Sequence, residues 1–251
     1  RQHKRSSRES LDCALALQEL VSMGVDNIIT FDAHDPRVQN AIPLSGFETV
    51  RPTYQFIKGL LRTVPDLIID SDHMMAISPD EGGTSRAVYL ANVLGLDMGM
   101  FYKRRDYTQI VDGRNPIVAH EFLGSSVEGK DVIIIDDMIS SGDSIIDVAT
   151  ELKRRKAKRI FAAATFGLFT NGLDKFDKAY EEGIIHGILT TNLIYQTPEL
   201  LSRPYYINCD LSKYIALLID TLNHDGSISS ILSPNERIQH VVQKYKNGEP
   251  I

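Results

Sequence analysis

The chain has 251 residues, of which 43% are hydrophobic and 24% charged, ordinary values for a globular protein. At roughly 100 to 200 residues per domain, this length predicts one large domain or two modest ones.

The net charge of −6 argues against a protein whose main function is to bind the phosphates of nucleic acids. No stretch approaches the ~20 apolar residues of a membrane span, and the first residues lack the apolar segment of a signal peptide. Two distant cysteines, Cys13 and Cys209, form no CxxC pair. We therefore expect a cytoplasmic protein with no nucleic-acid partner and no membrane partner.

Helix-like and strand-like segments alternate along the chain. Helical periodicity predicts helices at 10–23, 51–63, 83–94, 143–155, 172–182, 210–223 and 234–246. Short apolar runs predict strands at 27–31, 73–78, 98–102, 132–135, 159–164 and 185–190, with short antiparallel strands at 117–119 and 122–123 in a flap spanning 106–130. Strands separated by helices are typical of an α/β fold with mostly parallel sheets. The loops at 44–52 and 224–233, where Pro, Gly and Ser accumulate, are candidate domain boundaries.

Polar residues follow four of the predicted strands. Ligands of open parallel sheets bind beyond the carboxyl ends of the strands, so these positions are where chemistry is expected. The four ends read Asp32-Ala33-His34, Pro79-Asp80-Glu81-Gly82-Gly83, Lys103-Arg104-Arg105, and the stretch from Asp136 to Ser144.

The last of these ends is the most informative, because an apolar β-branched strand runs into two acids, a Ser/Gly loop and a helix. Backbone amides of such a loop and helix start, together with serine hydroxyls, make a phosphate site. The adjacent carboxylates of Asp136 and Asp137 can accept hydrogen bonds from a vicinal diol such as that of ribose. A strand-to-helix turn with capping serines is the alternative. Carboxylates at the rim of a buried sheet are otherwise costly, which favours the sugar-phosphate interpretation.

These residues carry a resemblance. The segment from Ile134 to Gly142 resembles the phosphoribosyl-binding loop of type I phosphoribosyltransferase folds. Together with 31–34 and 78–83 it is similar to the ribose-phosphate pyrophosphokinase, or phosphoribosyl pyrophosphate (PRPP) synthase, family. The similarity continues through Arg1-Gln2, Tyr102 to Arg105, Thr190-Thr191-Asn192 and Ser229 to Leu232, so it covers nearly the whole chain in order.

The resemblance implies a reaction and a set of site residues. The family transfers the β,γ-pyrophosphoryl group of Mg-ATP to the anomeric hydroxyl of ribose 5-phosphate, giving PRPP and AMP. It implies that Asp136 and Asp137 hold ribose hydroxyls and that the phosphate lies on Ser140, Ser141, Gly142, Asp143 and Ser144. It also implies that Asp80, Glu81, Gly82 and Gly83 form the pyrophosphate loop, that Arg1 and Gln2 contact the nucleotide, that His34 and Asp80 coordinate Mg²⁺, and that Lys103 and Arg105 act in catalysis.

The chemistry of phosphoryl transfer and of magnesium binding is consistent with these roles. Phosphoryl transfer needs positioning and charge neutralisation more than covalent help. Lys103 and Arg105 are two residues apart at a strand end, so extended geometry places both on one side and Arg104 on the other. A solvated charge run is the alternative for this triplet. Magnesium prefers oxygen ligands and retains waters, so one histidine and one aspartate imply an ion that substrate phosphates complete. Asp32 and Asp35 are expected to orient the imidazole of His34.

The chain departs from the family pattern at several places. Ser140 replaces a usual acid, Asp143 replaces a glycine or small residue, and Phe166 replaces a usual histidine. A carboxylate at Asp143 repels a phosphate unless it turns outward at the helix start.

The family's N-terminal segment is also missing, and the chain starts without methionine, so we expect a processed or truncated chain. By resemblance, residues 1–50, completed by 225–251, are the remainder of an N-terminal phosphoribosyltransferase-like domain, and 51–224 are a C-terminal one that binds ribose 5-phosphate. A homo-oligomer, a hexamer built from dimers, is implied in the same way.

Two other functions compete with the leading one. A phosphoribosyltransferase would consume PRPP instead of making it; Lys103, Arg105, His34 and the two-domain length favour the pyrophosphokinase. A catalytically silent, regulatory relative is the non-enzyme alternative. The presence of Asp136 and Asp137 speaks against it, whereas Ser140 and Asp143 leave it open.

Overall fold

The computed structural model of the chain describes residues 7–105 and 117–251, and the side chains of all of these except 103–105 and 117–120. The chain divides into two compact units, Arg1–Pro52 and Thr53–Ile251. The first boundary therefore falls within the predicted loop at 44–52.

The described part of the first unit is small and built around two strands. Helix α1 (Asp12–Ser22) and the 3-10 helix η1 (Pro36–Ala41) flank strands β1 (Asn27–Phe31) and β2 (Gly46–Val50), which pair in parallel. Leu17, Val38 and Ile42 form its buried cluster. Strand β2 lies in a segment predicted as a loop. A Cβ at Gly46 would lie 2.0 Å from Oδ1 of the exposed Asn27, so a larger residue here would require the Asn27 side chain to turn away.

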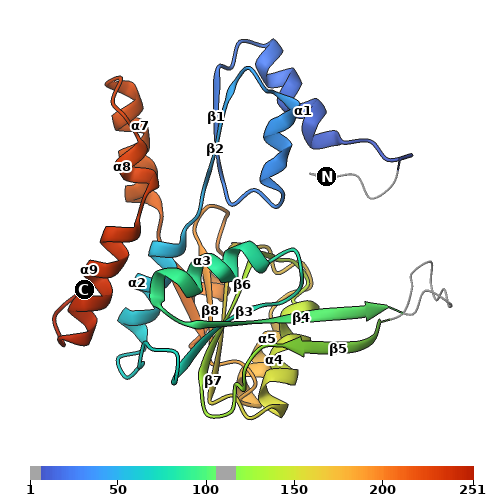
Figure 1. The fold of residues 1–251 in the computed structure, drawn as a ribbon, viewed down its shortest axis with the longest axis vertical. Coiled ribbons are helices and arrows are strands. Elements are labelled where there is room, and N and C mark those ends of the chain that lie inside the picture. The colour runs from blue at the N-terminus through green and yellow to red at the C-terminus, as the bar shows by residue number, and fades with distance from the viewer. Residues whose placement is uncertain (1–6, 106–116) are drawn as a thin grey trace. The chain divides into compact units, whose positions relative to one another are not determined.

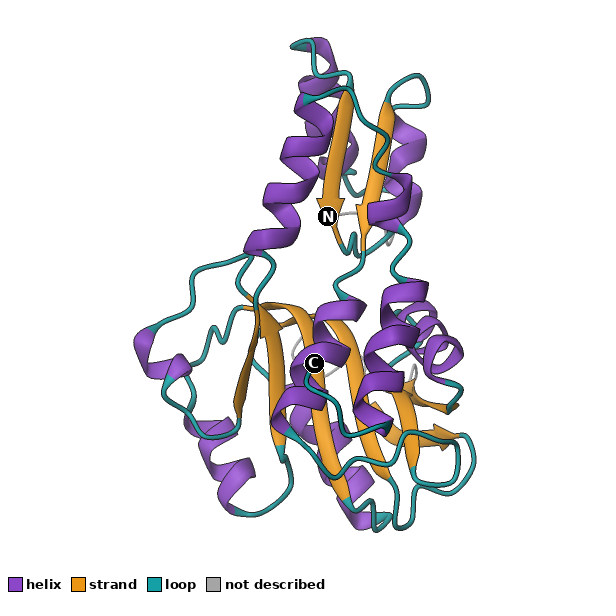
Figure 2. Ribbon diagram, turned by 90° about the vertical axis from the view of Figure 1, so that its left-hand side faces the viewer, coloured by secondary structure: helices purple, strands orange, loops and turns teal. Residues whose placement is uncertain are grey.

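The second unit is a twisted sheet covered by helices on both faces (Figures 1 and 2). Among the described residues its strand order is β5-β4-β3-β6-β7-β8-β9. The strands are β3 (Met74–Ser78), β4 (Asp97–Arg105), β5 (Ile117–Leu123), β6 (Asp131–Ile139), β7 (Arg159–Gly167), β8 (Gly187–Thr191) and β9 (Tyr206–Cys209). All neighbours pair in parallel except β4 and β5, which form an antiparallel pair. This confirms the predicted α/β fold with mostly parallel strands.

The helices divide between the two faces of the sheet. Helices α2 (Thr53–Thr63), α3 (Thr84–Leu94) and α9 (Asn235–Lys246) bury Phe56, Leu90 and Ile238 with sheet residues of one face. Helices α4 (Asp143–Arg154) and α5 (Asp174–Glu181) bury Val148 and Phe176 on the other. Both sides of β3 and β6 are thereby covered, which is why these strands read as continuous apolar runs.

The chain reverses its direction of travel across the sheet at β3. It adds β4 and β5 on one side of β3 and then returns to place β6 directly on the other side. The strands β3 and β6 pair from Met74↔Asp131 to Ile77↔Ile134. In open α/β sheets such a reversal point is where ligands bind, at the carboxyl ends of the two strands.

Several elements differ from the predictions. Strand β6 does not end at Asp136 and Asp137 but continues to Ile139, because β7 pairs with it as far as Ile139↔Gly167. One strand, β5, replaces the two short strands predicted at 117–119 and 122–123. Five further elements were not predicted from the sequence, and each has six residues or fewer: η1, β2, β9, α6 (Pro198–Leu201) and α8 (Ser229–Leu232). Such short elements give too little periodicity to stand out.

Residues 225–251 belong to the unit Thr53–Ile251, and their completion of a domain formed by residues 1–50 stays a prediction. Helix α9 within this segment buries Ile238, Val241 and Val242 against α2 and the sheet. Tyr245 Oη reinforces the contact, since it donates to Val64 O at 2.8 Å and accepts from Leu67 N at 2.7 Å.

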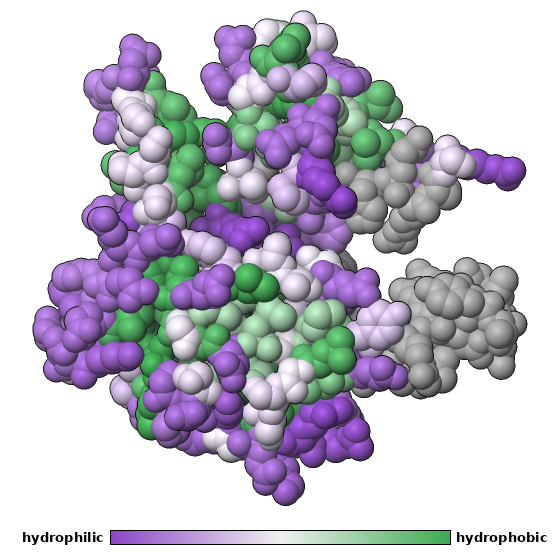
Figure 3. Space-filling model, in the orientation of Figure 1, coloured by the Kyte–Doolittle hydropathy of each residue, from purple (hydrophilic) through white to green (hydrophobic). Residues whose placement is uncertain are grey.

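Helix α7 (Ser212–Asn223) contributes little to this core. Leu218 is its buried residue, whereas Leu217, Ile219 and Leu222 are exposed. Figure 3 shows polar residues interspersed with smaller apolar areas on the visible face of the second unit, and apolar surface along this helix. No helix in the described part of the chain is both long enough and apolar enough to cross a membrane.

Candidate active site

Two strand-to-helix loops meet at the carboxyl edge of the sheet. Residues 79–83 connect β3 to α3, and residues 140–142 connect β6 to α4. Because β3 and β6 are neighbours, both loops lie at the point where the strand order reverses. The structure therefore brings together the predicted pyrophosphate loop and the predicted sugar-phosphate loop.

The loop after β3 is built around the carboxylate of Asp80. Its Oδ1 accepts from Gly82 N at 2.9 Å and from Gly83 N at 3.2 Å, while Ser78 Oγ donates to Asp80 O at 2.6 Å. A Cβ at Gly83 would lie 2.8 Å from Ser78 Oγ and 3.4 Å from Ile135 O. A larger residue at Gly83 would therefore displace the Ser78 hydroxyl that donates to Asp80 O. Glu81 is exposed beside it.

The donor set at this loop fits a loosely held Mg²⁺. With Oδ1 of Asp80 held by two amides, Oδ2 accepts no hydrogen bond from a described residue. A fixed carboxylate with one available oxygen is a suitable ligand for magnesium, which commonly takes one or two protein carboxylates and completes its shell with water and phosphates. No cluster of three or more His, Cys, Asp or Glu side chains arranged for a metal occurs in 7–105 and 117–251.

Asp136 and Asp137 lie in the last part of β6, beside the loop of Asp80. Asp137 is 4% exposed, and its N donates to Asp136 Oδ1 at 2.9 Å. Burial, then the hydrogen bond and negative charge of Asp137, and further the charge of Asp80, raise the pKa of Asp136 to about 8. The pair therefore holds a proton at neutral pH, and presents both donor and acceptor capacity to a diol.

Replacing Asp136 with asparagine is expected to stabilise the ligand-free chain more at pH 8 than at pH 5. The carboxyl of Asp136 has a higher pKa in the folded chain than its ordinary value of 3.8. The folded state therefore loses stability as pH rises from about 4 to about 8, and asparagine removes this loss. We expect a gain of roughly 3 to 4 kcal/mol at pH 8 relative to pH 5, measured by urea denaturation. An equal effect at both pH values would contradict the raised pKa.

The loop after β6 ends in a left-handed glycine that starts helix α4. Gly142 has φ +85° and is the N-cap residue of α4. Ser140 O accepts from Thr170 N at 3.0 Å, which ties the loop to the segment after β7. Asp143 N donates to Ser141 Oγ at 3.5 Å. Ser140, Ser141, Gly142 and Ser144 border this helix start, and helix N-termini are common places for anions to bind.

Asp143, the departure expected to repel a phosphate, is neutralised by a lysine on another helix. Lys175 Nζ on α5 forms an ion pair with Asp143 Oδ1, and Ser141 Oγ donates to Asp143 Oδ2 at 2.8 Å. Lys175 and then Ser141 hold the pKa of the Asp143 carboxyl below its usual range. The carboxylate is therefore engaged by α5 and by its own loop.

Lys175→Ala is expected to weaken ribose 5-phosphate binding by about three- to tenfold, since it leaves the charge of Asp143 uncompensated beside the phosphate loop. Titration calorimetry measures the effect. Lys178→Ala, which removes the same charge from the same helix, serves as the control. The double variant Asp143→Ala, Lys175→Ala is expected to recover the affinity, and a double variant as weak as Lys175→Ala would contradict this account.

The remaining predicted site residues fall into three groups. Arg1 and Gln2 lie outside the described residues. His34 is exposed after β1 in the first unit, and the nearby Asp35 carboxylate accepts from Arg37 Nε at 2.8 Å and Nη2 at 2.7 Å. Lys103 and Arg105 end β4, where the pairing with β5 shifts register between Arg104 and Arg105. The expected placement of Lys103 and Arg105 on one side of the strand stays a prediction.

Sequence reasoning missed two cations near the site. One is Lys175, which nothing in its local sequence distinguishes from other surface lysines. The other is Arg86 on α3, which is 5% exposed and donates from Nη1 to Gly82 O at 3.5 Å. Its position three residues after Gly83, in the first turn of the helix that leaves the loop, is a signal that could have marked it.

Comparison with known proteins identifies the family. Residues 56–185 match the phosphoribosyl transferase domain. The chain is 30% identical over 232 residues to the ribose-phosphate pyrophosphokinase of Pasteurella multocida, which covers 91% of this chain and 68% of that protein. The chain belongs to the ribose-phosphate pyrophosphokinase family.

Other members of the ribose-phosphate pyrophosphokinase family agree in extent. The protein from Vibrio parahaemolyticus is 29% identical over 236 residues, again 91% of this chain and 68% of the relative. The fold is similar to the crystal structure of phosphoribosylpyrophosphate synthetase from Mycobacterium smegmatis, with a TM-score of 0.73 at 22% identity over 90% of this chain and 68% of that one. The chain thus spans about two thirds of the length of these ribose-phosphate pyrophosphokinases.

Proposed function

We propose that the chain transfers the pyrophosphoryl group of Mg-ATP to the anomeric hydroxyl of ribose 5-phosphate, with the sugar phosphate held by residues 136–144. The observation that carries this proposal is the position of that segment. A buried acid pair and a helix start lie together at the reversal point of the sheet, next to the loop of Asp80. A diol and a phosphate group of one small molecule match these two features.

The two halves of the segment serve different groups of the sugar phosphate. Asp136 and Asp137 would hold the ribose hydroxyls, and Ser140 to Ser144 would hold the 5-phosphate at the start of α4. Because Lys175 and Ser141 engage the Asp143 carboxylate, the loop keeps the amides of the helix start as its anion-binding groups. This arrangement fixes the sugar at both ends and so orients its anomeric hydroxyl.

The transfer itself is a displacement at phosphorus. The anomeric oxygen forms a bond to the β-phosphorus of ATP while the bond from that phosphorus to the α,β-bridging oxygen breaks, AMP leaves with the electron pair, and the hydroxyl proton is released. Lys103 and Arg105 would neutralise charge on the transferred group. Asp80 would be a ligand of the Mg²⁺. When bound, the ion supplies charge neutralisation on the phosphate oxygens.

A direct test is AMP formation from ATP, Mg²⁺ and ribose 5-phosphate by the full chain. We expect AMP and PRPP in equal amounts, dependent on the sugar phosphate. Bound ribose 5-phosphate without AMP above background would instead support a catalytically silent relative, the alternative that Ser140 and Asp143 leave open.

Asp137→Asn tests the sugar site separately from the chemistry. The Asp137 carboxyl is nearly fully buried, so its replacement removes an acceptor that solvent cannot replace. We expect ribose 5-phosphate to bind at least tenfold more weakly by calorimetry, with circular dichroism unchanged. Wild-type affinity in this variant would remove Asp137 from the site.

A further inference from the structure

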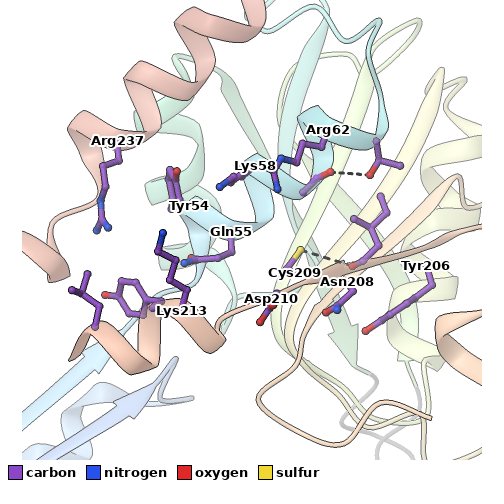
Figure 4. A pocket seen from close by; sticks show the side chains of 15 residues that line it. Tyr54, Gln55, Lys58, Arg62, Tyr206, Asn208, Cys209, Asp210, Lys213 and Arg237 are labelled. Carbon is purple, nitrogen blue, oxygen red and sulfur yellow. Dashed lines mark hydrogen bonds between the residues drawn. The ribbon is translucent and has the colours of Figure 1, made fainter. Parts of the chain in front are cut away.

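A second cavity of the Thr53–Ile251 unit lies away from the two loops of the candidate active site. It has a volume of about 490 Å³ and lies between helices α2, α7 and α9 and the edge strand β9. We call it the α2–α7–α9 pocket (Figure 4). Its volume is within the range of small-molecule sites. Neither the loop of Asp80 nor residues 136–144 contribute to its wall.

The wall of this pocket is strongly basic. Lys58 and Arg62 come from α2, Lys213 from α7 and Arg237 from α9, against one acid, Asp210. In Figure 4 the side chains of Lys58, Lys213 and Arg237 converge from three helices around Tyr54 and Gln55. The whole chain carries a net charge of −6, so this pocket is positively charged in a chain that is negatively charged overall.

These cations have little compensation from the protein. None of the four forms an ion pair with a carboxylate side chain of the described residues. The contacts of Lys58 and Arg237 with the Tyr54 ring are cation–π contacts, at 5.8 Å and 5.5 Å from its centroid. Burial and then the charges of Arg62 and Lys213 lower the pKa of Lys58. Like charges gathered in one cavity are unfavourable unless an anion binds among them.

The geometry of the donors leaves capacity for a ligand. Arg62 Nε donates to Ile251 O at 2.8 Å, and Arg237 Nη2 donates to Ile231 O at 2.7 Å. Each guanidinium has five N–H donors, so most remain for another acceptor. Asp210 is held at the other side of the pocket by Ser212 N and Asn192 Nδ2, at 2.8 Å and 2.7 Å. An anion is therefore directed toward the α2 side and away from Asp210.

We propose that the α2–α7–α9 pocket binds a small molecule carrying a chain of two or three phosphate groups. Four arginine and lysine side chains on three helices line this pocket, and a chain of phosphate groups offers them more acceptor oxygens and more negative charge than a single phosphate. The bound phosphate groups would contact α2, α7 and α9 together. The ligand would thereby hold the C-terminal helices on the sheet.

Calorimetric titration with inorganic tripolyphosphate tests the proposal, in protein saturated with ribose 5-phosphate. The double variant Lys58→Ala, Lys213→Ala is expected to lose one binding event per chain, or to bind there at least tenfold more weakly. The matched control Lys158→Ala, Lys178→Ala removes two exposed lysines outside the pocket and is expected to bind as the wild type does. Equal binding by both double variants would overturn the proposal.

Further measurements define the ligand chemistry and guard against misfolding. The variant Lys58→Arg, Lys213→Arg is expected to retain binding, and unchanged ribose 5-phosphate affinity shows that each variant is folded. Citrate binding as tight as tripolyphosphate would overturn the assignment to phosphate chains. Titration with uridine triphosphate separates two sources of this chemistry. Binding of both compounds indicates that a nucleoside can carry the phosphate chain, and binding of tripolyphosphate alone indicates the free anion.

Discussion

Replacement of Lys103 by alanine is expected to lower kcat by about 100- to 1,000-fold while ribose 5-phosphate affinity stays within about twofold. The lysine would act on charge that develops during transfer and not on the sugar, and removing one such group costs ~3 to 4 kcal/mol of transition-state stabilisation. Strand β4 is parallel to β3, so Lys103 lies toward the carboxyl edge where the loops of the site meet. The measurement is AMP release under saturating substrates, with calorimetry for the sugar phosphate.

Arg104→Ala is the matched control for this prediction. It removes one positive charge from the position next to Lys103. We expect Arg104→Ala to keep kcat within a few-fold of the wild type. If both variants were equally impaired, the general charge of the strand end would matter and the specific role of Lys103 would be lost. Normal turnover by Lys103→Ala would have the same consequence.

The parts of the candidate site that the sequence predicted are those whose residues follow one another along the chain. Asp136 to Ser144 and Asp80 to Gly83 are each continuous, and a parallel sheet brings their strand ends to one edge. The apolar run at 132–135 predicted that strand β6 exists, but it did not predict where the strand ends. Its extension to Ile139 depends on the pairing with β7, which is a contact between distant segments.

The parts that the sequence did not predict depend on such distant contacts. Lys175 lies 32 positions after Asp143, and only the packing of α5 beside α4 makes it a partner of that acid. The pKa of Asp136 is likewise a property of burial and of its neighbours, which a residue pattern does not contain. The cations of the α2–α7–α9 pocket lie on three separate helices, so no continuous sequence motif predicts this pocket.

Gly142→Ala is expected to destabilise the chain by about 3 kcal/mol and to weaken ribose 5-phosphate binding by tenfold or more. Gly142 has φ +85°, a conformation that costs an L-residue about 1 kcal/mol. In addition, the new Cβ would lie 2.1 Å from Cζ of Phe176, which is fully buried and stacks edge-on with Phe169. Overpacking of this kind adds about 1 to 3 kcal/mol. Urea denaturation and calorimetry measure the two effects.

Gly129→Ala isolates the backbone part of this cost. Gly129 has φ +75°, and a Cβ there would meet no atom within 4 Å, so the substitution has strain without overlap. We expect a loss of about 1 kcal/mol and wild-type ribose 5-phosphate affinity. The difference between the two variants then measures the steric contact of the phosphate loop with Phe176. Equal losses in the two would show that the ring gives way, and unchanged sugar-phosphate affinity in Gly142→Ala would separate the start of α4 from phosphate binding.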